Sequence, residues 1–388
     1  MAEKLQGPSF YSYNLTVETK VNIDELIYVL SPMDLPLLTG VGASGQVLLP
    51  RSPVDNIEFS WLEEEVPLPR ATLNTTMNTV VTSVVVNSGE GIKFAVGDAI
   101  RIDDEVMLVT AIATDTLTVT RGSAAETNTT AAAHTAGAEV IGLGTILIEG
   151  AIGSSTFQGR DKYSNYTQIW SRKVQVSRTE QRIPKYGVPN ELNRQMMNTM
   201  QGLNLGVEQT ALYGVKHQQS TNKRRQTGGL DGFLTSNIDA ASTWLTVDSI
   251  EARLQAAYNL GGSFQYIMAQ PAAFQALNNT TGNERVQTVT IDDARRGRRQ
   301  ATVVMTEFGE VELVRNRWVR KNNAFGVNRE NFVFRVLQPM FTEKLAKTDD
   351  TDTYMMLTEG GFEVKGQAHM AKWTALDTAS ALPGSGLV

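Results

Sequence analysis

The chain has 388 residues, with 35 lysines and arginines, 41 aspartates and glutamates, three histidines and no cysteine, and its net charge is -6. Without cysteine it can form no disulfide, thiolate nucleophile, cysteine-ligated zinc site or iron–sulfur cluster. The mild charge excludes a histone-like nucleic-acid binder, and the sequence has no run of about 18 apolar residues that could span a bilayer.

The first residues lack the apolar core of a secretion signal, so we expect no export by that route. Apolar positions between Val21 and Leu30 recur at intervals of three and four, which predicts a short helix that Ser31-Pro32 ends. Residues 40–45 read GxGxxG, a sequence that binds phosphate when it joins a strand to a helix. The following residues, 46–50, cannot begin a helix, so we interpret this stretch as a flexible hinge and predict no nucleotide site.

Two stretches are predicted to form a long two-stranded ribbon. The first, residues 50–70, is rich in proline and strand-like, and a run of three glutamates follows its Trp61. The second comprises residues 165–170 and 173–177, where apolar and polar residues alternate. We expect the two stretches to pair with each other, so that the residues between them form an insertion at a hairpin tip, where insertions disturb a core least.

The intervening residues, 71–145, differ from the rest of the chain in composition. They contain 15 threonines, a single aromatic residue (Phe94), and three basic against eight acidic residues, which gives a net charge of -5. β-Branched runs and alternating patterns, separated by aspartate-containing turns, predict short strands. We expect these strands at 80–86, 99–102, 105–112 and 116–120. The segment is therefore predicted to be a separate all-β module, whose meander needs further strand pairing to be stable.

A long amphipathic helix is predicted downstream of the ribbon. Asn190 is a helix-capping residue, and apolar positions from Leu192 to Ala211 recur every three or four residues. Gly202 and Gly206 would each weaken this helix by up to about 1 kcal/mol relative to alanine, so we expect a neighbour in close contact there. We interpret three methionines of the helix as core packing: Met196, Met197 and Met200.

The remaining elements predict a mixed α+β fold class. A second helix is expected from Asp248 to Leu260, with Glu251 completing a pattern similar to a capping box. A third helix is expected to begin with Pro271, a residue favoured in a first turn. Strands are predicted at 301–306, 310–314, 331–337, 353–358 and 361–368, the last two around a glycine-rich turn.

No constellation of residues indicates a catalytic, cofactor or metal site. His134, His217 and His369 lie about 80 to 150 residues apart, in no zinc-binding arrangement. The loop 349–352 has three aspartates but lacks the glycine and the distal glutamate of a calcium loop. We interpret it as a solvated acidic loop.

Two basic clusters, residues 223–225 and 295–299, have the charge to neutralise phosphates in a salt-dependent way. Neither has interleaved aromatic residues for stacking on bases. We therefore expect ion pairs between subunits, a solvated loop, or weak non-specific contact with DNA, and no recognition of a DNA sequence. The stretch 315–320 alternates like a strand edge, with arginines along one side.

Several short segments carry a family resemblance: Asp24–Leu38, Ser164–Trp170, Val174–Val176, Gly228–Gly232, Met268–Pro271, Val314–Trp318 and Glu343–Thr348. Together they resemble the major capsid proteins of tailed bacteriophages, which have the Hong Kong 97 fold, and in particular their SU-ten-like branch. The resemblance spans residues 15–65 and 150–378 in preserved order. Residues 71–145 depart from it, because they stand where the family's extended loop turns back.

The resemblance implies an α+β Hong Kong 97-type capsid fold with an N-terminal arm, an extended β-hairpin loop, a long spine helix, and peripheral and axial domains. An inserted small all-β domain is added to this plan. The expected regions are the arm at 1–45, the extended loop at 46–70 and 146–180, the inserted β domain at 71–145, the peripheral domain at 181–260 and 340–388, and the axial domain at 261–339.

The resemblance also implies a function. The chain would be a major capsid protein that self-assembles into hexamers and pentamers, forming the virion head shell around double-stranded DNA after assembly in the host bacterial cytoplasm. It implies no enzyme activity, cofactor, metal or membrane partner. Because the N-terminal region is short, we expect a separate scaffold protein, and a portal is a further implied partner. A decoration protein is left open.

A shell subunit needs residues that contact its neighbours. We expect Phe59, Trp61 and Leu62, on a ribbon that cannot bury them, to find cover on an adjacent copy. The glutamates that follow are expected to form ion pairs with arginines across subunit boundaries. Exposed pairs of this kind contribute about 0 to 1 kcal/mol each, so we expect them to set the register between neighbouring copies. The candidate inter-subunit contacts are Arg51, Phe59, Trp61, Glu63, Glu64, Glu65, Arg70, Arg172 and Arg178.

Two alternatives come from other functional classes. A virion attachment or decoration protein would bind a host surface through the 71–145 module, although the chain has no internal period of about 20 to 50 residues typical of fibres. A carbohydrate hydrolase would need paired carboxylates, and the sequence offers no way to pair its acids. For a capsid protein, we expect the module to stiffen the capsomer, since its strands offer little for a binding hot spot.

Overall fold

The computed structural model describes residues 34–40, 47–64, 66, 68–122, 127–150, 159–183, 190–240, 244–280, 286–293, 297–347 and 349–377. The chain divides into two compact units, one comprising Met1–Trp61 and Ser164–Val388 and the other Leu62–Tyr163. We call them the body and the β unit and describe each by itself. Within the described ranges, no helix is long and apolar enough to cross a membrane.

The helix predicted at 21–30 and the glycine-rich hinge, apart from Gly40, lie outside the described residues.

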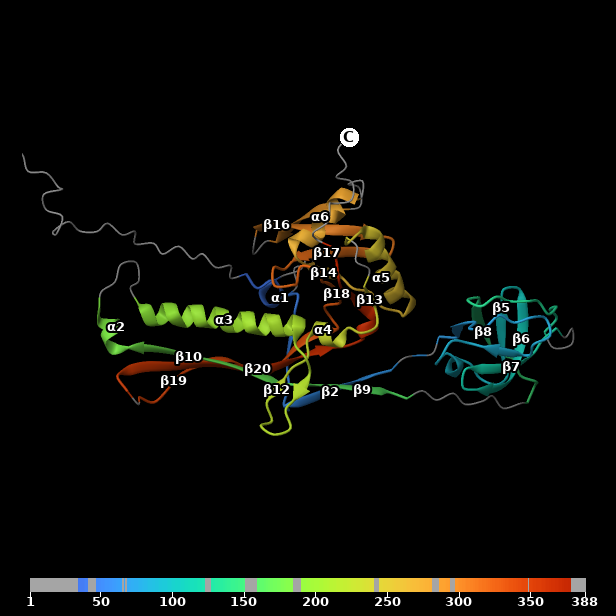
Figure 1. Ribbon diagram of the computed structural model, residues 1–388, viewed down its shortest axis with the longest axis horizontal. Helices are drawn as coiled ribbons and strands as arrows, with labels where there is room; N and C mark the ends of the chain where they lie inside the picture. Colours follow the sequence, from blue (N-terminus) through green and yellow to red (C-terminus); the bar gives the residue numbers. More distant parts are fainter. Residues whose placement is uncertain are drawn as a thin grey trace, which may run out of the picture. The chain divides into compact units, whose positions relative to one another are not determined.

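The body contains a four-stranded sheet with the strand order β1-β19-β20-β10 (Figure 1). Its strands are β1 (Arg51–Pro53), β10 (Gln168–Ser177), β19 (Phe332–Lys344) and β20 (Thr351–Val364). β1 runs parallel to β19, and the other neighbours are antiparallel. On β10, the ring of Trp170 packs edge-on against Phe334 and Phe362, and the three residues belong to the main hydrophobic core.

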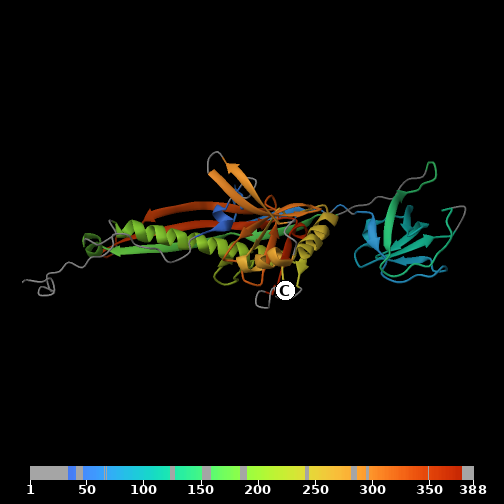
Figure 2. The same ribbon diagram turned by 90° about the horizontal axis from the view of Figure 1, so that it is seen from above.

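Helix α3 (Glu191–Tyr213) runs beside β10, as Figures 1 and 2 both show. The side chain of Asn190 accepts a hydrogen bond from the N–H of Asn193 at 3.1 Å and so caps the helix, as predicted. The C-terminal half of the helix buries Leu203 and Val207 in the main core. Capping and periodicity therefore predicted this helix and the C-terminal part of its buried stripe correctly.

Two expectations about helix α3 are wrong. Met197 and Met200 are not core residues, because 62% and 41% of their surfaces are exposed. Gly202 has no close neighbour, since a Cβ there would meet nothing within 4 Å, and at Gly206 the nearest atom is Trp170 Cδ1 at 3.9 Å. Periodicity finds the apolar stripe of a helix but not how much of the stripe the rest of the subunit covers.

The predicted ribbon is partly right. Strand β2 (Glu58–Glu63) pairs with β9 (Asp161–Tyr166), which contains only Asn165 and Tyr166 of the predicted partner stretch. Strand β10, however, pairs along its whole length with β20 and not with the upstream stretch. Alternation of apolar and polar residues identifies a strand and its faces, but it carries no information about the strand's partner.

Strand β20 passes straight through Gly360 and Gly361, where the sequence suggested a turn. A Cβ on Gly360 would lie 2.7 Å from the carbonyl oxygen of Arg335. A Cβ on Gly361 would lie 2.7 Å from both Phe59 Cε1 and the carbonyl oxygen of Tyr166. The two glycines are therefore needed for the close approach of neighbouring backbone and rings, not for a turn.

The rest of the body is a seven-stranded sheet, with the order β13-β21-β18-β14-β17-β16-β15, and its helices. The strands are β13 (Ile238–Asp239), β14 (Tyr266–Ala269), β15 (Val286–Asp293), β16 (Gly297–Thr306), β17 (Gly309–Arg315), β18 (Ala324–Val327) and β21 (Ala371–Trp373). The β15–β16 hairpin projects from this sheet (Figure 2). Because β17 ends at Arg315, the strand edge predicted over 315–320 does not form.

Helix α5 (Val247–Asn259) begins at a different cap from the predicted one. The Thr246 side chain accepts a hydrogen bond from the N–H of Ser249 at 3.2 Å, while Asp248 lies inside the first turn, where a negative charge is favourable. Helix α6 (Pro271–Thr280) begins with proline, as predicted. The short elements of the body are α1 (Pro36–Thr39), α2 (Arg178–Arg182), β11 (His217–Gln218), β12 (Arg225–Gln226), α4 (Leu230–Phe233) and η3 (Gln367–His369).

The β unit is built on a six-stranded sheet with the order β3-β8-β5-β6-β7-β4. Its elements are β3 (Arg70–Thr72), β4 (Ser83–Val85), η2 (Gly91–Lys93), β5 (Asp98–Ile102), β6 (Glu105–Ala113), β7 (Thr116–Thr120) and β8 (Glu139–Thr145). The predicted meander is confirmed as β5, β6 and β7, and β8 and β4 supply the further pairing it needs. Buried residues such as Ile100, Met107 and Val140 form a core of its own.

Candidate assembly surfaces

Phe59 and Trp61 do not need an adjacent copy for cover, because both are buried within their own chain. Their ring centroids lie 6.3 Å apart in a stacked arrangement, and Trp61 also contacts Phe233 at 5.8 Å. The cover expected from an adjacent copy is therefore provided within the chain: Phe233 of helix α4 packs on Trp61, and Phe59 lies next to Gly361 of β20. An inter-subunit contact of these two residues stays a prediction. Leu62, the next residue of β2, is 62% exposed, and its contact with an adjacent copy stays a prediction.

Three of the charged candidates make ion pairs within the chain: Glu64–Arg160 at 2.8 Å, Arg70–Glu139 at 3.6 Å and Arg178–Asp350 at 3.4 Å. All six side chains are close to half exposed or more, so each pair contributes about 0 to 1 kcal/mol and exchanges easily for a partner on another copy. Arg51 and Arg172 are exposed, and Glu65 lies outside the described residues. The inter-subunit role of these residues and of Glu63 stays a prediction.

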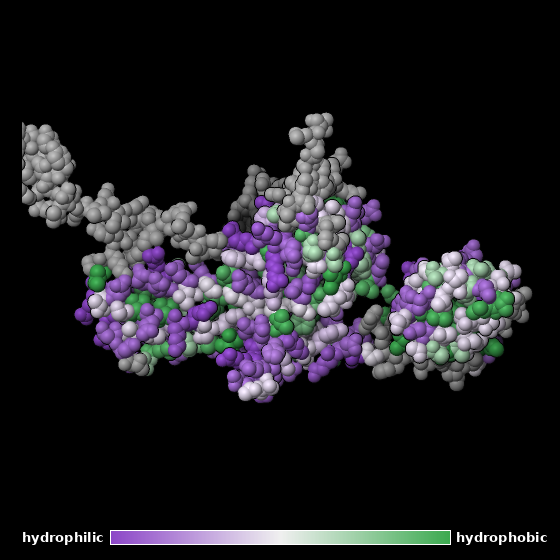
Figure 3. All heavy atoms as spheres, viewed as in Figure 1, coloured by the Kyte–Doolittle hydropathy of each residue, from purple (hydrophilic) through white to green (hydrophobic). Residues whose placement is uncertain are grey.

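Helix α3 presents apolar side chains that the subunit leaves uncovered. Met197 and Met200 lie in its N-terminal half, and Ile183, just after α2, is also exposed. Figure 3 shows hydrophobic residues gathered on the surface along this helix. Exposed apolar groups surrounded by polar residues are typical of protein–protein contact surfaces, so this face is suited to contact with another copy.

Glu208 fastens helix α1 to helix α3. Its Oε1 accepts hydrogen bonds from the N–H of Leu37 at 3.2 Å and from Nδ2 of Asn316 at 2.9 Å, and its Oε2 accepts one from the N–H of Leu38 at 3.5 Å. Burial raises the pKa of the Glu208 carboxyl to about 7, although these hydrogen bonds oppose the rise, and the nearby charge of Asp34 adds to it. One buried side chain thus connects three segments of the body.

Asp34, at the start of the described chain, makes two further contacts. Its carboxylate pairs with Arg317 Nε at 2.8 Å, and its carbonyl oxygen accepts a hydrogen bond from Trp318 Nε1 at 2.8 Å. The guanidinium of Arg320 lies elsewhere, 4.6 Å from the ring centroid of Tyr213. Arg317 and Arg320 therefore have separate partners and do not form one basic row.

Asn165 anchors the base of the ribbon. It is fully buried, and its Nδ2 lies 3.0 Å from Thr227 Oγ1, 3.0 Å from the carbonyl oxygen of Gly228 and 2.6 Å from that of Phe362. Its Oδ1 accepts a hydrogen bond from the N–H of Gly228 at 2.9 Å. This amide therefore joins two of the segments that carried the family resemblance.

Other charged groups singled out in the sequence have structural partners within the body. Arg225, from the first basic cluster, pairs with Glu359 at 2.9 Å. Asp352, from the acidic loop, lies 3.1 Å from both Lys347 and Lys344, and the hydrogen bonds from these lysines lower its pKa to about 2. In the second basic cluster, residues 295 and 296 lie outside the described part of the chain.

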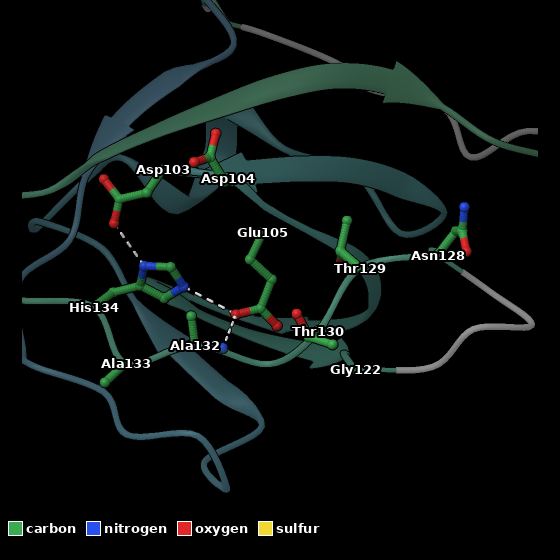
Figure 4. A pocket seen from close by; sticks show the side chains of 10 residues that line it. All are labelled: Asp103, Asp104, Glu105, Gly122, Asn128, Thr129, Thr130, Ala132, Ala133 and His134. Carbon is green, nitrogen blue, oxygen red and sulfur yellow. Dashed lines mark hydrogen bonds and ion pairs between the residues drawn. The ribbon is translucent and has the colours of Figure 1, made fainter.

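A cavity of about 570 Å³ opens on the β unit, next to the β5–β6 turn (Figure 4). In its wall, His134 Nδ1 lies 2.7 Å from Asp103 Oδ2, and His134 Nε2 lies 3.0 Å from Glu105 Oε2. Each ring nitrogen of His134 therefore faces one carboxylate oxygen. Glu105 also accepts hydrogen bonds from Arg121 Nε at 2.9 Å and from the N–H of Ala132 at 2.9 Å.

These contacts give Glu105 a structural role. Burial alone would raise the pKa of its carboxyl, but Arg121, the N–H of Ala132 and His134 together hold that pKa below its usual value. Among the described residues, no group of three or more acidic or histidine side chains is arranged to hold a metal ion. No sequence pattern indicates this cluster, because its members come together only through the packing of β5, β6 and the segment before β8.

A family model matches most of the chain. This model, described as SU10 major capsid protein, matches residues 9–377. The capsid of Myoviridae phage XM1 is similar in structure, with a TM-score of 0.51 and 10% sequence identity, over 96% of this chain and 100% of that chain.

Two further structures are similar with lower scores. One, from Mycobacterium phage Adephagia, has a TM-score of 0.49 and 8% identity, over 96% of this chain and 100% of that chain. The other, the holo-SrpI encapsulin complex from Synechococcus elongatus PCC 7942, has a TM-score of 0.43 and 11% identity, over 57% of this chain and 79% of that chain. No curated protein sequence matches the chain.

Proposed function

Since the chain belongs to the SU10 major capsid protein family and is the major capsid protein of a tailed bacteriophage, we propose that its copies assemble as hexamers and pentamers around a double-stranded DNA genome. The fold is a Hong Kong 97-type capsid fold of the α+β class. The family match over residues 9–377 carries the proposal. The exposed methionines of α3 support it, because a shell subunit needs apolar surface that only a neighbouring copy covers.

Electron microscopy of the expressed chain, with and without the products of neighbouring genes, tests this assembly. We expect shells, tubes or hexamer rings from the unmodified chain. The double substitution Met197→Asp/Met200→Asp should abolish them, since it places two charges on the exposed face of α3. Asn198→Asp, at an exposed polar position of the same helix, is the matched control and should still assemble.

The far-ultraviolet circular dichroism of both variants should match that of the unmodified chain, which would show that the subunit still folds. A dilute monomer under every condition, without particles, would overturn the assembly proposal.

We propose the following division of the chain: the arm at 1–45, the extended loop at 46–70 and 146–180, the inserted β domain at 71–145, the peripheral domain at 181–260 and 340–388, and the axial domain at 261–339. The separate compactness of Leu62–Tyr163, with its own hydrophobic core, supports an inserted β domain. The long helix α3 beside β10 and β20 supports a spine helix in the peripheral domain.

We propose that shells form in the host bacterial cytoplasm with a separate scaffold protein and a portal, and that the packaged DNA meets only weak, non-specific contacts. A decoration protein is a further partner to look for on purified heads. We also infer a structural and not a catalytic role, which the membership of a capsid family supports. Mass spectrometry of purified heads and of their precursors would identify the scaffold, portal and decoration partners.

Attachment to a host surface through the β unit is the alternative function. The cavity beside the β5–β6 turn does not favour it, because the buried polar atoms of Glu105 and His134 already bond to Arg121, Ala132 and Asp103. Among the described residues that line the cavity, there is no tryptophan, tyrosine or phenylalanine to stack against a sugar ring. We therefore keep stiffening of the capsomer as the proposed role of this unit.

A further inference from the structure

Helix α1 is docked on helix α3 through a buried carboxylate that has only neutral partners. α1 lies beside the C-terminal half of α3 (Figure 1), and Glu208 of α3 is fully buried there. The hydrogen-bond donors around this carboxylate are the N–H groups of Leu37 and Leu38 and the side-chain amide of Asn316. Among the described residues, no cationic side chain forms an ion pair with it. Because a buried charge without a counter-charge is unfavourable, the charged form of Glu208 is costly at this site.

The two oxygens of Glu208 are not equivalent. Oε1 accepts hydrogen bonds from the N–H of Leu37 at 3.2 Å and from Nδ2 of Asn316 at 2.9 Å. Oε2 meets only the N–H of Leu38, at the longer distance of 3.5 Å. A neutral carboxyl can therefore keep both bonds at Oε1 and carry its proton on Oε2. The docked arrangement thus accommodates a proton without the loss of its main contacts.

Helix α1 covers Glu208 with apolar side chains. Leu37 and Leu38 are both buried in the main core. Residues 34–40 belong to no sheet, and the N–H of Leu48 donates to the carbonyl oxygen of Gly40 at 3.1 Å. α1 can therefore move away from α3 without breaking a strand pair, and water then reaches the carboxylate.

We propose that Glu208 is a proton-operated latch: with its proton it keeps α1 docked on α3, and loss of that proton to the solvent favours release of α1 while the rest of the body stays folded. The latch acts within one chain, so it does not depend on the proposed assembly. Because α1 lies within the proposed arm, 1–45, the latch sets how firmly this end of the arm is attached to the body.

The direction of the effect follows from the two states of the carboxyl group. The removal of water raises the pKa of docked Glu208 to about 7, whereas a hydrated glutamate has the ordinary value of about 4.5. Between these two values, each pH unit raises the ratio of released to docked α1 about tenfold. α1 is therefore held most firmly in acid and most weakly above about pH 7.

Few other charges act on the latch. Asp34, just before α1, adds to the rise in the pKa of Glu208, and its own ion pair with Arg317 at 2.8 Å partly offsets its charge. On α3, the positions one turn before and one turn after Glu208, 204–205 and 211–212, carry no titratable side chain. The pH dependence of α1 docking is therefore assigned to Glu208.

Hydrogen–deuterium exchange of the full-length chain, kept as dissociated subunits, tests the latch. The reporters are the amides of Leu37, Leu38 and Thr39, the last of which donates to the carbonyl oxygen of Leu35 at 3.0 Å. Exchange rates between pH 5 and pH 8 are divided by those of an unstructured peptide at the same pH, so that the ratio reports only the opening of α1. We expect the protection of these amides to fall about 70-fold from pH 5 to pH 8, mostly below pH 7.

Strand β14 (Tyr266–Ala269) is the internal reference, because it pairs with strands on both sides. Its amides exchange only through wider unfolding, and we expect them to be at least about tenfold better protected than those of α1 at each pH. Equal protection of α1 and β14 at every pH would overturn the proposal, by showing that α1 opens only when the body unfolds. Protection of α1 that does not change with pH would overturn it as well.

Two variants assign the effect to one residue. Glu208→Gln has no proton to release and should remove the pH dependence at α1. Glu330→Gln, which changes an exposed glutamate, is the matched control and should keep the full decrease. Circular dichroism shows whether each variant folds, and the pH profile of the unmodified chain decides the proposal by itself where Glu208→Gln does not. The same decrease in folded Glu208→Gln would overturn the proposal, because another group would then cause it.

Discussion

Glu208 connects three segments of the body through one buried carboxylate, and its charge depends strongly on the fold. Two backbone N–H groups of α1 and the amide of Asn316 favour its charged form, but the removal of water from around it favours the neutral form and dominates. The balance leaves its pKa at about 7, compared with about 4.5 for an ordinary glutamate.

This pKa makes the stability of the subunit depend on pH. Between about 4.5 and about 7 the folded chain holds a proton on Glu208 that the unfolded chain has released, so the free energy of unfolding falls as the pH rises through this range. The decrease due to this group is on the order of 3 kcal/mol. Glu208→Gln cannot ionise, and we expect it to remove this part of the pH dependence.

Urea unfolding of dissociated subunits near pH 5 and near pH 8 measures the effect. Glu330→Gln, which changes an exposed glutamate, is the control and should keep the pH dependence of the unmodified chain. The same dependence in the unmodified chain and in Glu208→Gln would contradict the assignment.

The cluster around Glu105 is the corresponding feature of the β unit. Arg121 and Glu105 are almost fully buried as a pair at 2.5 Å, and Arg121 also donates to the carbonyl oxygens of Asn78 and Val81. A buried pair adds little stability in itself, but the loss of one partner leaves an uncompensated charge. The cluster therefore holds the segments that contain Asn78, Val81 and Ala132 in place beside the sheet. This role needs no ligand.

At the scale of elements, strand β20 shows why a glycine pair need not be a turn. It crosses the body next to β10 and β19, and Gly361 lies where Phe59 of β2 and the backbone of β9 come closest to it. Any larger side chain would have to displace a ring or a carbonyl group there. The strand is continuous because hydrogen bonds on both sides hold it extended.

Gly361→Ala should therefore destabilise the subunit by about 1 to 3 kcal/mol, since the new Cβ overlaps Phe59 Cε1 and the Tyr166 carbonyl oxygen at 2.7 Å. Gly202→Ala on α3 is the matched control, where nothing lies within 4 Å of the new Cβ. There we expect a gain of up to about 1 kcal/mol from the better helix propensity of alanine. Chemical denaturation of both variants measures the two changes in the free energy of unfolding. If Gly202→Ala lowered this free energy as much as Gly361→Ala, the result would contradict this account.

At the scale of the whole molecule, the chain contains separate hydrophobic cores. Those of the body and that of the β unit share no residue, and Arg70 and Ile141 are partners on neighbouring strands where the chain enters and leaves the β unit. A core with no shared side chains does not depend on its neighbour for packing.

Replacement of residues 71–145 by a short glycine–serine linker should therefore leave the body folded. All the α-helices among the described residues lie in the body, so the helical signal in circular dichroism reports on the body, and we expect its melting temperature to stay close to that of the unmodified chain. The control replaces residues 247–259 by the same glycine–serine linker, which removes α5 from its core. This variant should lose cooperative melting. Loss of the helical signal in the first variant would contradict the independence of the two cores.

The sequence alone determined the elements whose signals are local. Helix α3 follows from the cap at Asn190 and an apolar period of three and four, and the meander β5–β6–β7 follows from alternation and two aspartate-containing turns. The concentration of negative charge in residues 71–145 could also be read from the sequence. The same is true of the short segments that carry the family resemblance, which occur in the family's order. Each of these features depends on residues close together in the chain or on simple composition.

Only the tertiary structure decided which elements meet. It paired β10 with β20, covered Trp61 with Phe233, and exposed Met197 on a helix whose stripe the sequence assigned to the core. It also brought Glu208 to Leu37 across 171 residues. The physical reason is that a local pattern specifies a conformation and the face that is to be buried. Which element covers that face depends on the packing of the whole chain, because the apolar side chains that can cover it come from distant segments.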